Sequence, residues 1–549
     1  MLLSNLDLLA TAPGGVARLR ELILTLAVQG KLVPQDPKDE PASELLKKIR
    51  AEKDRLILEG KIKRDKPLAE IAEEEKPFAL PPSWGWIRFG DAAINRDGER
   101  IPVSSSDRDN RAKTYDYYGA SGVIDKIDGF LFDKTLLLIG EDGANLINRS
   151  TPIAFLAHGK YWVNNHAHVI DTTHPELMTY LALFINAISL EPYVTGTAQP
   201  KMNQAKLNSI VIALPPLPEQ SRIVTRVEEL MRLCDALEAK GQLEATQHAQ
   251  LVSALLATLT DSETPAQLTD NWHRIATHFD LLLDRPEAVD ALEQTILQLA
   301  VRGLLVPQDP QDEPASALLK KIRAEKDKLI LDGKIKRDKP LPPITEDEQP
   351  FALPRGWEWV PIETLADVGT GTTPSRDNVA FFADGSIPWV TSGETGKPFI
   401  AETAQHVTEL ALSQTSLTVY PVGTLIVAMY GQGKTRGQVS ELQIEATTNQ
   451  ACAAIVLVEP SFAHRSFVKL VFEKSYDEIR ELSAGGAQPN LNVGKIKATL
   501  IPLPPLAEQS RIVTRVAQLR RLCFELRQRL SASQSTQAHL AEALVQDVG

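Results

Sequence analysis

The stretch of sequence that decides the fold occurs twice. Residues 22–67 read LILTLAVQGKLVPQDPKDEPASELLKKIRAEKDRLILEGKIKRDKP, and residues 295–340 read TILQLAVRGLLVPQDPQDEPASALLKKIRAEKDKLILDGKIKRDKP, with 38 identities in 46 positions. A second pair follows at residues 214–235 (LPPLPEQSRIVTRVEELMRLCD) and 503–524 (LPPLAEQSRIVTRVAQLRRLCF), with 17 identities in 22. Two copies at so long a period exclude a solenoid and indicate one frame built twice.

Between the repeated segments lie two stretches, roughly residues 84–213 and 357–502, that hardly resemble each other. Both follow a Pro-Phe-Ala-Leu-Pro segment, open with Trp-x-Trp and close with Ala-Gln-Pro-x-x-Asn. We call these variable stretches the heads and the repeated parts the frame. The expected parts are an N-terminal helical frame segment (1–82), a first head (83–213), a central helical frame (214–345), a second head (346–502) and a C-terminal spacer helix (503–549).

The order of the frame pieces is circular. The first part of the central frame recurs only at the C-terminus, and its second part recurs only at the N-terminus. Joining the tail to the start would therefore rebuild a second central frame. We expect a pseudo-two-fold molecule that closes on itself where its two ends meet.

The frame is predicted to be helical. After Pro-Pro-Leu, apolar residues recur at alternating spacings of four and three, which is the a/d pattern of a coiled coil. Two cysteines on this seam are interpreted as buried small apolar residues and not as reactive thiols. Residues 43–60 and 316–333 are shorter amphipathic helices, whose charged faces are either solvated or a docking surface for a partner. The seam residues are Ile223, Val227, Leu230, Cys234 and Leu237 in the first copy, and Ile512, Val516, Leu519, Cys523 and Leu526 in the second.

The heads are predicted to mix short strands with one or two helices. Strand-like runs alternate with Gly-, Asn- and Ser-rich turns, an α+β pattern whose polar loops can carry recognition groups. The expected strands are 135–139, 161–163, 387–390, 424–428 and 453–457, and the expected helices lie near 176–188 and 465–483.

Composition narrows the class of protein. The 549 residues include three cysteines without a CxxC pair, which indicates a reducing compartment, and no apolar run approaches the roughly 20 residues needed to span a bilayer. We expect a cytoplasmic protein without a membrane partner. The net charge of −12 has the wrong sign for binding nucleic acid by bulk charge, so basic groups must be local or come from another subunit.

Catalytic motifs are weak. The segment 428–435 (AMYGQGKT) loosely fits a phosphate-binding loop, but the sequence after it does not predict the helix that would hold the phosphates. His166-x-His168 would place two imidazoles on one strand face, without an evident third metal ligand. There is no Asn/Asp-Pro-Pro-aromatic tetrapeptide, nucleophile elbow or nuclease carboxylate cluster, so we expect a non-catalytic chain that binds no cofactor or metal.

What the heads do offer is hydrogen-bonding side chains beside basic ones. Arg reads guanine, Asn and Gln read adenine, and Lys mainly contacts phosphate. Each residue alone is more typical of a polar surface or turn, but their grouping in two unlike heads on one repeated frame favours recognition. The candidates are Lys113, Tyr117, Tyr118, Ser121, Arg149, Asn164, Asn165, His166, His168, Lys201 and Asn203 in the first head, and Thr372, Arg376, Ser392, Tyr430, Gln432, Lys434, Arg436, Asn449, Gln450, Gln488 and Asn490 in the second.

Over essentially its whole length the chain resembles the specificity subunits of Type I restriction-modification systems. The most specific pieces are LPPLPEQSRIVTRVEELM and LAVQGKLVPQDPKDEPAS with their copies, YYGASGVIDKIDGF and YWVNNHAHVI in the first head, and GTGTTPSR, PWVTSGE and TTNQACAAI in the second.

The resemblance implies that each head is a target recognition domain reading half of a bipartite site on double-stranded DNA. It also implies two long antiparallel helices as a spacer. Two modification subunits would supply S-adenosylmethionine and adenine N6-methyltransferase chemistry, and restriction subunits would supply ATP- and Mg-dependent translocation and cleavage. The alternatives are a single chain that itself methylates or cuts DNA, and a coiled-coil scaffold that binds only proteins.

Overall fold

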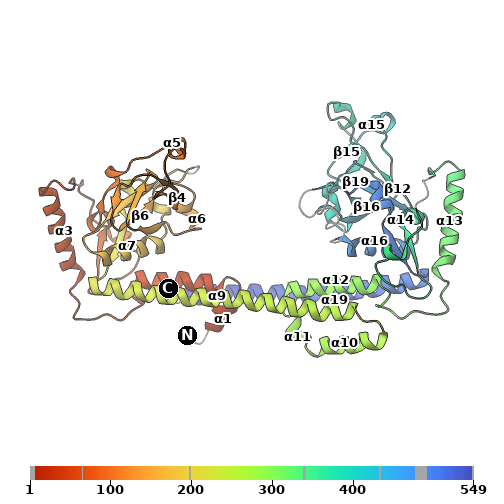
Figure 1. The fold of residues 1–549 in the computed structure, drawn as a ribbon, viewed down its shortest axis with the longest axis horizontal. Coiled ribbons are helices and arrows are strands. Elements are labelled where there is room, and N and C mark those ends of the chain that lie inside the picture. The colour runs from red at the N-terminus through yellow and green to blue at the C-terminus, as the bar shows by residue number, and fades with distance from the viewer. Residues whose placement is uncertain are drawn as a thin grey trace. The chain divides into compact units, whose positions relative to one another are not determined.

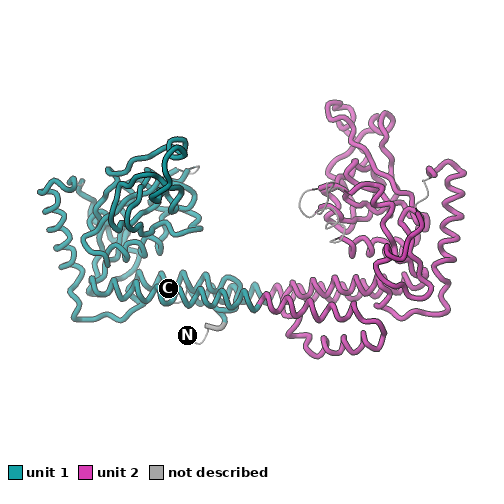
Figure 2. The backbone as a smooth tube through the Cα atoms, in the orientation of Figure 1, with its two compact units in different colours: residues 1–244, 533–549 teal, residues 245–532 magenta. Residues whose placement is uncertain are grey.

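The chain folds into two compact units (Figure 2). The structure is a computed structural model that describes residues 6–64, 66–196, 199–337, 342–431, 435–476 and 491–546. Unit 1 comprises residues 1–244 with 533–549, and unit 2 comprises residues 245–532. Each unit holds one head, the beginning of one long helix and the end of the other, so the helices α9 (Leu217–Thr260) and α19 (Leu506–Gln546) run antiparallel. This confirms the predicted α+β fold with an antiparallel helical spacer.

In unit 1 the beginning of α9 packs on the short frame helix α2 (Gly15–Val28). Ile223 and Val227 are buried in one cluster with apolar residues of α2. Arg20 of α2 also donates to Asp235 of α9 at 2.6 Å. The apolar seam of α9 therefore packs against the apolar side of α2 and against the first head.

The chain ends meet in unit 1, as the circular repeat predicts. Leu9 in α1 (Leu6–Thr11) and Ala12 share a small apolar cluster with Ala541 near the end of α19. Arg18 lies 3.5 Å from the Glu542 carboxylate. The N-terminal helices and the C-terminal turns thus rebuild the second copy of the frame.

The first head is a central four-stranded antiparallel sheet with a second sheet on one face and a helix on the other (Figure 1). Along β6, Leu136 and Leu138 point into the core between the two sheets, whereas Leu137 and Ile139 pack toward the helix and frame. The central sheet runs β2 (Ile94–Asn95), β9 (Ala167–Asp171), β6 (Leu136–Gly140), β7 (Ala154–Ala157). The second runs β4 (Gly122–Ile127), β3 (Tyr115–Gly119), β8 (Lys160–Val163), β5 (Phe132–Asp133), and the helix is α7 (Pro175–Ala187).

The second head has the same plan despite its different sequence. Its central sheet places the first strand beside the last, followed by two middle strands in the same order as in the first head, with one further strand at the edge. A three-stranded sheet covers one face, and α16 (Phe462–Lys474) packs on the other. The central sheet runs β12 (Ala366–Thr370), β19 (Cys452–Leu457), β16 (Leu425–Ala428), β17 (Val439–Leu442), β14 (Phe399–Ile400), and the covering sheet runs β15 (His406–Val407), β13 (Ile387–Val390), β18 (Thr447–Thr448).

Each head leaves the frame through a pair of antiparallel strands. In unit 1, β1 (Gly85–Arg88) pairs with β10 (Val211–Leu214), and in unit 2, β11 (Glu358–Pro361) pairs with β20 (Leu500–Leu503). The first Trp of each Trp-x-Trp motif directly precedes the first strand of the pair, the second Trp lies in that strand, and Pro-Pro follows the second strand. The two ends of each head therefore lie side by side at the start of a long helix.

The frame of unit 2 repeats that of unit 1 and adds an insertion. Helix α12 (Pro286–Val301) packs on the beginning of α19 as α2 does on α9, and Arg527 of α19 donates to Glu293 of α12 at 3.0 Å. The insertion consists of α10 (Pro265–Thr277) and α11 (Phe279–Leu282). Among the helices described in either unit, none combines the length and hydrophobicity needed to cross a membrane.

Candidate nucleic-acid interface

In the first head, three turns and one loop converge at one end of the two sheets. The amide of Asn164 donates to the carbonyl of Tyr118, and the amide of Glu141 donates to the carbonyl of His166. The loop at Lys201 joins them through an isolated bridge to Asp142. The exposed side chains presented here, which we call reading edge 1, are Ser121, Asn165, His166 and Lys201.

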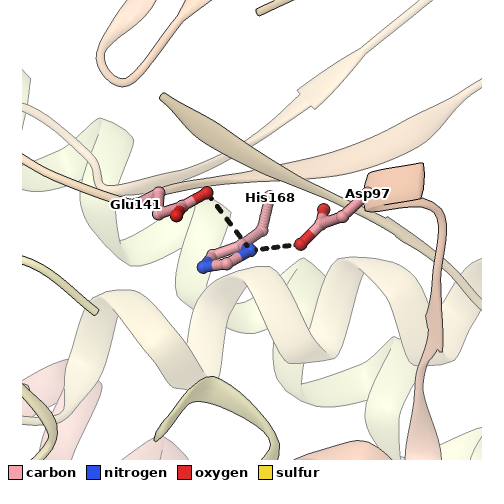
Figure 3. A group of neighbouring side chains, drawn as sticks. All are labelled: Asp97, Glu141 and His168. Carbon is pink, nitrogen blue, oxygen red and sulfur yellow. Dashed lines mark hydrogen bonds and ion pairs between the residues drawn. The ribbon is translucent and has the colours of Figure 1, made fainter. Parts of the chain in front are cut away.

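Beneath reading edge 1 lies a network of buried charges (Figure 3). His168 Nδ1 lies 2.6 Å from Asp97 and 3.9 Å from Glu141. His168 Nε2 donates to the main-chain carbonyl of Met202 at 2.8 Å, since a carbonyl can only accept. Burial would raise the pKa of Asp97, but the hydrogen bond and charge of His168, with help from Arg100, lower it.

Asp97, Glu141 and His168 offer ligand atoms within 4.8 Å of one another, which is close enough for the three to share a metal ion. However, Arg100 donates to Glu141 at 2.8 Å and lies 3.3 Å from Asp97, and Lys201 lies 3.2 Å from Glu141. These cations already neutralise the carboxylates. We therefore interpret the group as an internal ion-pair network that fixes the turns of reading edge 1.

The metal-site alternative for His166-x-His168 does not fit this arrangement. His166 is exposed just before β9 and pairs with Asp142 at 2.7 Å, whereas His168 is buried on the strand. The two imidazoles have different partners because one belongs to the turn and the other to the sheet.

In the second head, the loops that follow β12, β13, β16 and β18 converge in the same way. The indole of Trp389 donates to the carbonyl of Thr372 at 3.2 Å, and the Thr373 hydroxyl donates to Gln450. The amide of Met429 donates to the carbonyl of Ala451 at 2.7 Å. The side chains brought together here, which we call reading edge 2, are Thr372, Arg376, Ser392, Tyr430, Asn449 and Gln450.

The two reading edges are equivalent. In both heads an asparagine side chain accepts from the amide two residues later, at 2.8 Å in Asn164–His166 and 2.9 Å in Asn449–Ala451. Both turns enter the matching central strand, because the neighbouring pairs Gly140↔Ala167 and Ala428↔Cys452 occupy the same place in the two sheets. The middle residue of each turn is exposed, Asn165 in one and Gln450 in the other. Each head thus presents a carboxamide side chain at the same point.

Three predicted contact residues of the first head are corrected to interior ones. Tyr117 is buried, and its hydroxyl bonds to the main chain of Val103. Asn164 and His168 are also buried, and their polar atoms are used within the turn and the ion-pair network. Alternation along a strand predicts that half the polar-looking positions point inward, but the sequence alone does not say which half.

Other predicted residues of the first head have structural partners away from reading edge 1. Arg149, whose φ is 50°, donates to the carbonyl of Ile188 at the end of α7. Lys113 pairs with Asp125 at 2.9 Å, and the hydrogen bonds from Arg108 and Lys113 lower the pKa of that carboxyl.

Two further predicted residues of the first head also have structural surroundings. Asn203 caps α8 (Gln204–Ser209) through the amide of Lys206 at 3.0 Å. Tyr118 is half-buried, and its ring stacks on Phe155 at a centroid distance of 6.0 Å. Burial, then the charge of Asp116, raises the pKa of its phenol.

In the second head the phosphate-loop alternative is not supported. After β16, the described residues 435–442 form a turn and the strand β17, so no helix begins there to hold phosphates. Arg436 lies in this turn and is half-buried. The candidates Gln432, Lys434, Gln488 and Asn490 lie outside the described residues.

The seam residues divide by unit. Three seam residues are buried in each unit: Ile223, Val227 and Cys234 in unit 1, and Ile512, Val516 and Cys523 in unit 2. Burial raises the pKa of the Cys234 thiol and of the Cys523 thiol. The remaining seam leucines are half-buried: Leu230, Leu237, Leu519 and Leu526.

Sequence reasoning missed a buried carboxylate at the root of each head. Trp84 Nε1 donates to Glu219 at 3.1 Å, and Gln35 Nε2 donates to the same carboxylate at 2.6 Å. In unit 2, Trp357 and Gln308 donate to Glu508 at 3.0 and 3.4 Å. The signal was present, because the Trp, the Gln and the Glu are each identical in the two copies.

These two clusters, which we call clasps, each join three segments of the chain. The Trp starts the head, the Gln comes from the loop after the short frame helix, and the Glu begins the long helix. The loop is tight: a Cβ on Gly30, whose φ is +71°, would lie 2.6 Å from Pro81 and 3.0 Å from Trp84. Burial raises the pKa of Glu219 and Glu508, although the hydrogen bonds from Trp and Gln oppose it.

Comparison with known proteins identifies the family. Residues 84–247 and 354–533 match the family described as Type I restriction modification DNA specificity domain. The chain is 37% identical over 566 residues to the Type I restriction enzyme EcoEI specificity subunit of Escherichia coli, and 35% identical over 573 residues to the EcoAI specificity subunit of the same organism. Each alignment covers 96% of this chain and 93% of the relative.

A solved structure is also similar. A chain from work on complex assembly and conformational transition of the type I R-M system aligns with 86% of this chain and 99% of its own length, at 16% identity and a TM-score of 0.46. The family match and the full-length relatives carry the assignment: this chain belongs to the DNA specificity subunits of Type I restriction-modification systems.

Proposed function

We propose that each head reads one half of a bipartite DNA site through its reading edge, with Asn165 and Gln450 as the central base contacts. As a specificity subunit the chain is non-catalytic. The observation that carries the proposal is the pair of equivalent turns, each with an exposed carboxamide. Asn and Gln can bond the N6 and N7 positions of adenine in the major groove with two hydrogen bonds.

The surroundings of each carboxamide support specific reading. In reading edge 1 the neighbours are Ser121, His166 and Lys201, which combine neutral hydrogen-bonding groups with a cation. In reading edge 2 the neighbours are different. The amide of Tyr430 donates to the carbonyl of Ala451 in the turn at 3.4 Å, and the guanidinium of Arg376 lies 6.0 Å from the centre of the Trp389 ring. Equal positions with different neighbours are what two unlike half-sites require.

The partners follow from the family. We assign methyl transfer to two modification subunits that bring S-adenosylmethionine, and translocation with cleavage to restriction subunits that bring ATP and Mg²⁺. This chain would position them on double-stranded DNA. The scaffold alternative predicts no sequence-selective retention of DNA even with these partners present.

The test uses the complex with its modification subunits. Methylome sequencing of a host with and without the gene first defines the two half-sites. Asn165→Ala and Gln450→Ala should then each weaken discrimination by about 1–3 kcal/mol at one base pair of one half-site. Gln247→Ala, which removes an exposed carboxamide from α9, is the matched control and should leave base discrimination unchanged.

Two results would contradict the proposal. If either variant changed both half-sites together, the heads would not read independently. If both variants kept full discrimination, the equivalent turns would not be the base contacts.

A further inference from the structure

Two segments of the frame are basic although the chain is acidic. Residues 42–64 carry eight Lys or Arg against four Asp or Glu, and residues 315–337 carry eight against three. We call them basic segments 1 and 2. They are identical at 20 of 23 positions, and together they hold a net charge of +9 in a chain of −12. The rest of the chain therefore sits at −21.

Each basic segment is attached to its own head. In basic segment 1, the helix α3 (Ala42–Leu58) lies beside the first head (Figure 1). It buries Leu45 and Ile49, and Lys53 donates to the main-chain carbonyls of Gly90 and Ala93 at 2.7 and 3.0 Å. These carbonyls lie in and just after α4 (Phe89–Ala92), at the root of the first head.

Basic segment 2 repeats this attachment. The helix α13 (Ala315–Leu331) buries Leu318 and Ile322, and Lys326 donates to the carbonyls of Glu363 and Ala366, the latter at 2.9 Å. Glu363 belongs to α14 (Ile362–Leu365), which takes the place of α4 in the second head. In both units one lysine is thus used to hold the segment, and the other cations are left for the outer side.

The outer side of each segment exposes cations at matching positions. Some of them are engaged in surface ion pairs, such as Lys48 with Glu40 at 2.5 Å and Lys321 with Glu313 at 2.7 Å. Exposed pairs of this kind contribute little to stability, so they cost little to break. The exposed residues on which the inference rests are Arg50, Lys63 and Arg64 in basic segment 1, and Arg323, Lys336 and Arg337 in basic segment 2.

The heads themselves lack the positive charge that DNA demands. Residues 84–213 hold 12 Lys or Arg against 14 Asp or Glu, and residues 357–502 hold 10 against 15. A duplex carries one phosphate charge per about 1.7 Å of its axis, and neutralising these charges supplies essentially all of the non-specific affinity for DNA and a large share of the specific affinity. Cations that lie beside each head would add to the few that the reading edges hold, such as Lys201 and Arg376.

We propose that the basic segments contact the DNA phosphate backbone beside each half-site. The inference rests on the proposed function, because it requires DNA at the heads. The near-identity of the segments supports it: the heads differ because bases differ, whereas phosphates are chemically the same on both sides. The segments thus supply affinity without sequence preference, and the reading edges supply discrimination.

The test neutralises the exposed cations in the complex with modification subunits. Variant 1 carries Arg50→Gln, Lys63→Gln and Arg64→Gln, variant 2 carries Arg323→Gln, Lys336→Gln and Arg337→Gln, and a third combines all six. The attachment lysines are left intact, so the folds should persist. Arg226→Gln, Arg232→Gln and Lys240→Gln on α9 form a control with the same change of charge.

The readout is DNA affinity against salt on matched duplexes and on duplexes with one half-site scrambled. The slope of log K against log salt is negative, and every phosphate that a variant no longer neutralises should make it shallower by about 0.9. Each triple variant should therefore reduce the magnitude of the slope by roughly one to three. The six-fold variant should show the sum of the two decreases. The ratio of matched to scrambled affinity should stay unchanged, unlike in the reading-edge variants.

Other outcomes overturn the inference and identify the error. An unchanged slope with normal specific binding would show that the segments do not bind phosphate. Loss of modification subunits from the complex would make them a protein-docking surface, and an equal decrease in the α9 control would reduce the effect to bulk charge. If the unmodified complex itself showed no sequence preference, the proposed function would fail instead.

Discussion

Removing the carboxylate of the second clasp should loosen the second head and leave the first intact. In Glu508→Ala, the indole N–H of Trp357 loses its acceptor in a site where Glu508 is only 1% exposed. A buried donor without a partner costs about 1–3 kcal/mol, and the small cavity adds to this. Gln308 keeps its hydrogen bond to the carbonyl of Gly303 at 2.5 Å, so the loss of its second acceptor adds little to the destabilisation. We expect a total of about 2–4 kcal/mol.

The magnitude should be measured locally, because a chain of two units does not unfold in one step. Hydrogen exchange followed by mass spectrometry gives separate opening free energies for peptides of each head. Peptides around Trp357 and Phe467, whose rings meet edge to face at 6.0 Å, should lose protection, and those around Trp84 should not. The equivalent Glu219→Ala should give the reverse pattern.

Two controls separate the clasp from a general loss of charge. Glu508→Gln keeps an oxygen for the indole, so its cost should stay within about 1 kcal/mol. Glu525→Ala removes an exposed partner of Arg521 and should cost less than about 0.5 kcal/mol. Protection of the second head within about 0.5 kcal/mol of wild type in Glu508→Ala would refute the reasoning.

The clasp also has a pH dependence of defined sign. Burial raises the pKa of Glu508 above its ordinary value of 4.5, so between these two values the folded chain binds more protons than the unfolded chain. Stability contributed by this group therefore increases as the pH falls toward 4.5. Relative to Glu508→Gln, the wild-type second head should become more stable on acidification through that window, and a constant difference would contradict the burial of the charge.

Three further predictions follow from the frame and heads. Ile223→Asp places an unpaired charge at a fully buried position and should lower the free energy of unfolding by several kcal/mol. Leu519→Asp, at a half-buried position, should lower it by less. A near-normal free energy of unfolding in Ile223→Asp would disprove the packing of α9 on α2. Burial lowers the pKa of His464, which bonds Gln509 at 3.0 Å, below its ordinary value of 6.5. Because the unfolded chain then binds more protons below pH 6.5, unit 2 should lose stability as the pH falls through that value. In His464→Gln the opening free energy measured by hydrogen exchange should depend less on pH in this range. Exchange of residues 84–213 for the head of another family member should change one half of the methylated motif, and a change of both halves would count against independent heads.

The repeat made the architecture predictable, because identity at a constant offset reports a shared frame without any knowledge of side-chain packing. The a/d spacing located α9 and α19, and the circular order predicted that the chain ends meet, as they do where Leu9 and Ala541 share a cluster. The partner of the seam was less predictable. Ile223 and Val227 pack on α2, and an amphipathic stripe does not identify the surface that covers it.

In the heads the sequence located strands better than side chains. The five expected runs all contain or overlap strands, and β13 has the expected bounds of 387–390. Tyr117 and His168 were nevertheless predicted as DNA contacts, because Tyr and His are common both inside and outside a protein. The equivalence of Asn165 and Gln450 was hidden as well, since it lies in register and hydrogen bonding and not in residue identity.

The paired strands at the root of each head have a consequence for how such chains can change. The two ends of a head leave the frame from neighbouring strands, which lie about 4.8 Å apart. Each head is thus inserted into the frame as a loop whose two ends are held together. The entropic cost of closing such a loop grows only slowly with its length. A genetic crossover that cuts at both strands can replace the whole recognition module, or extend it by 16 residues as between these two heads, without disturbing the packing of one frame helix on another.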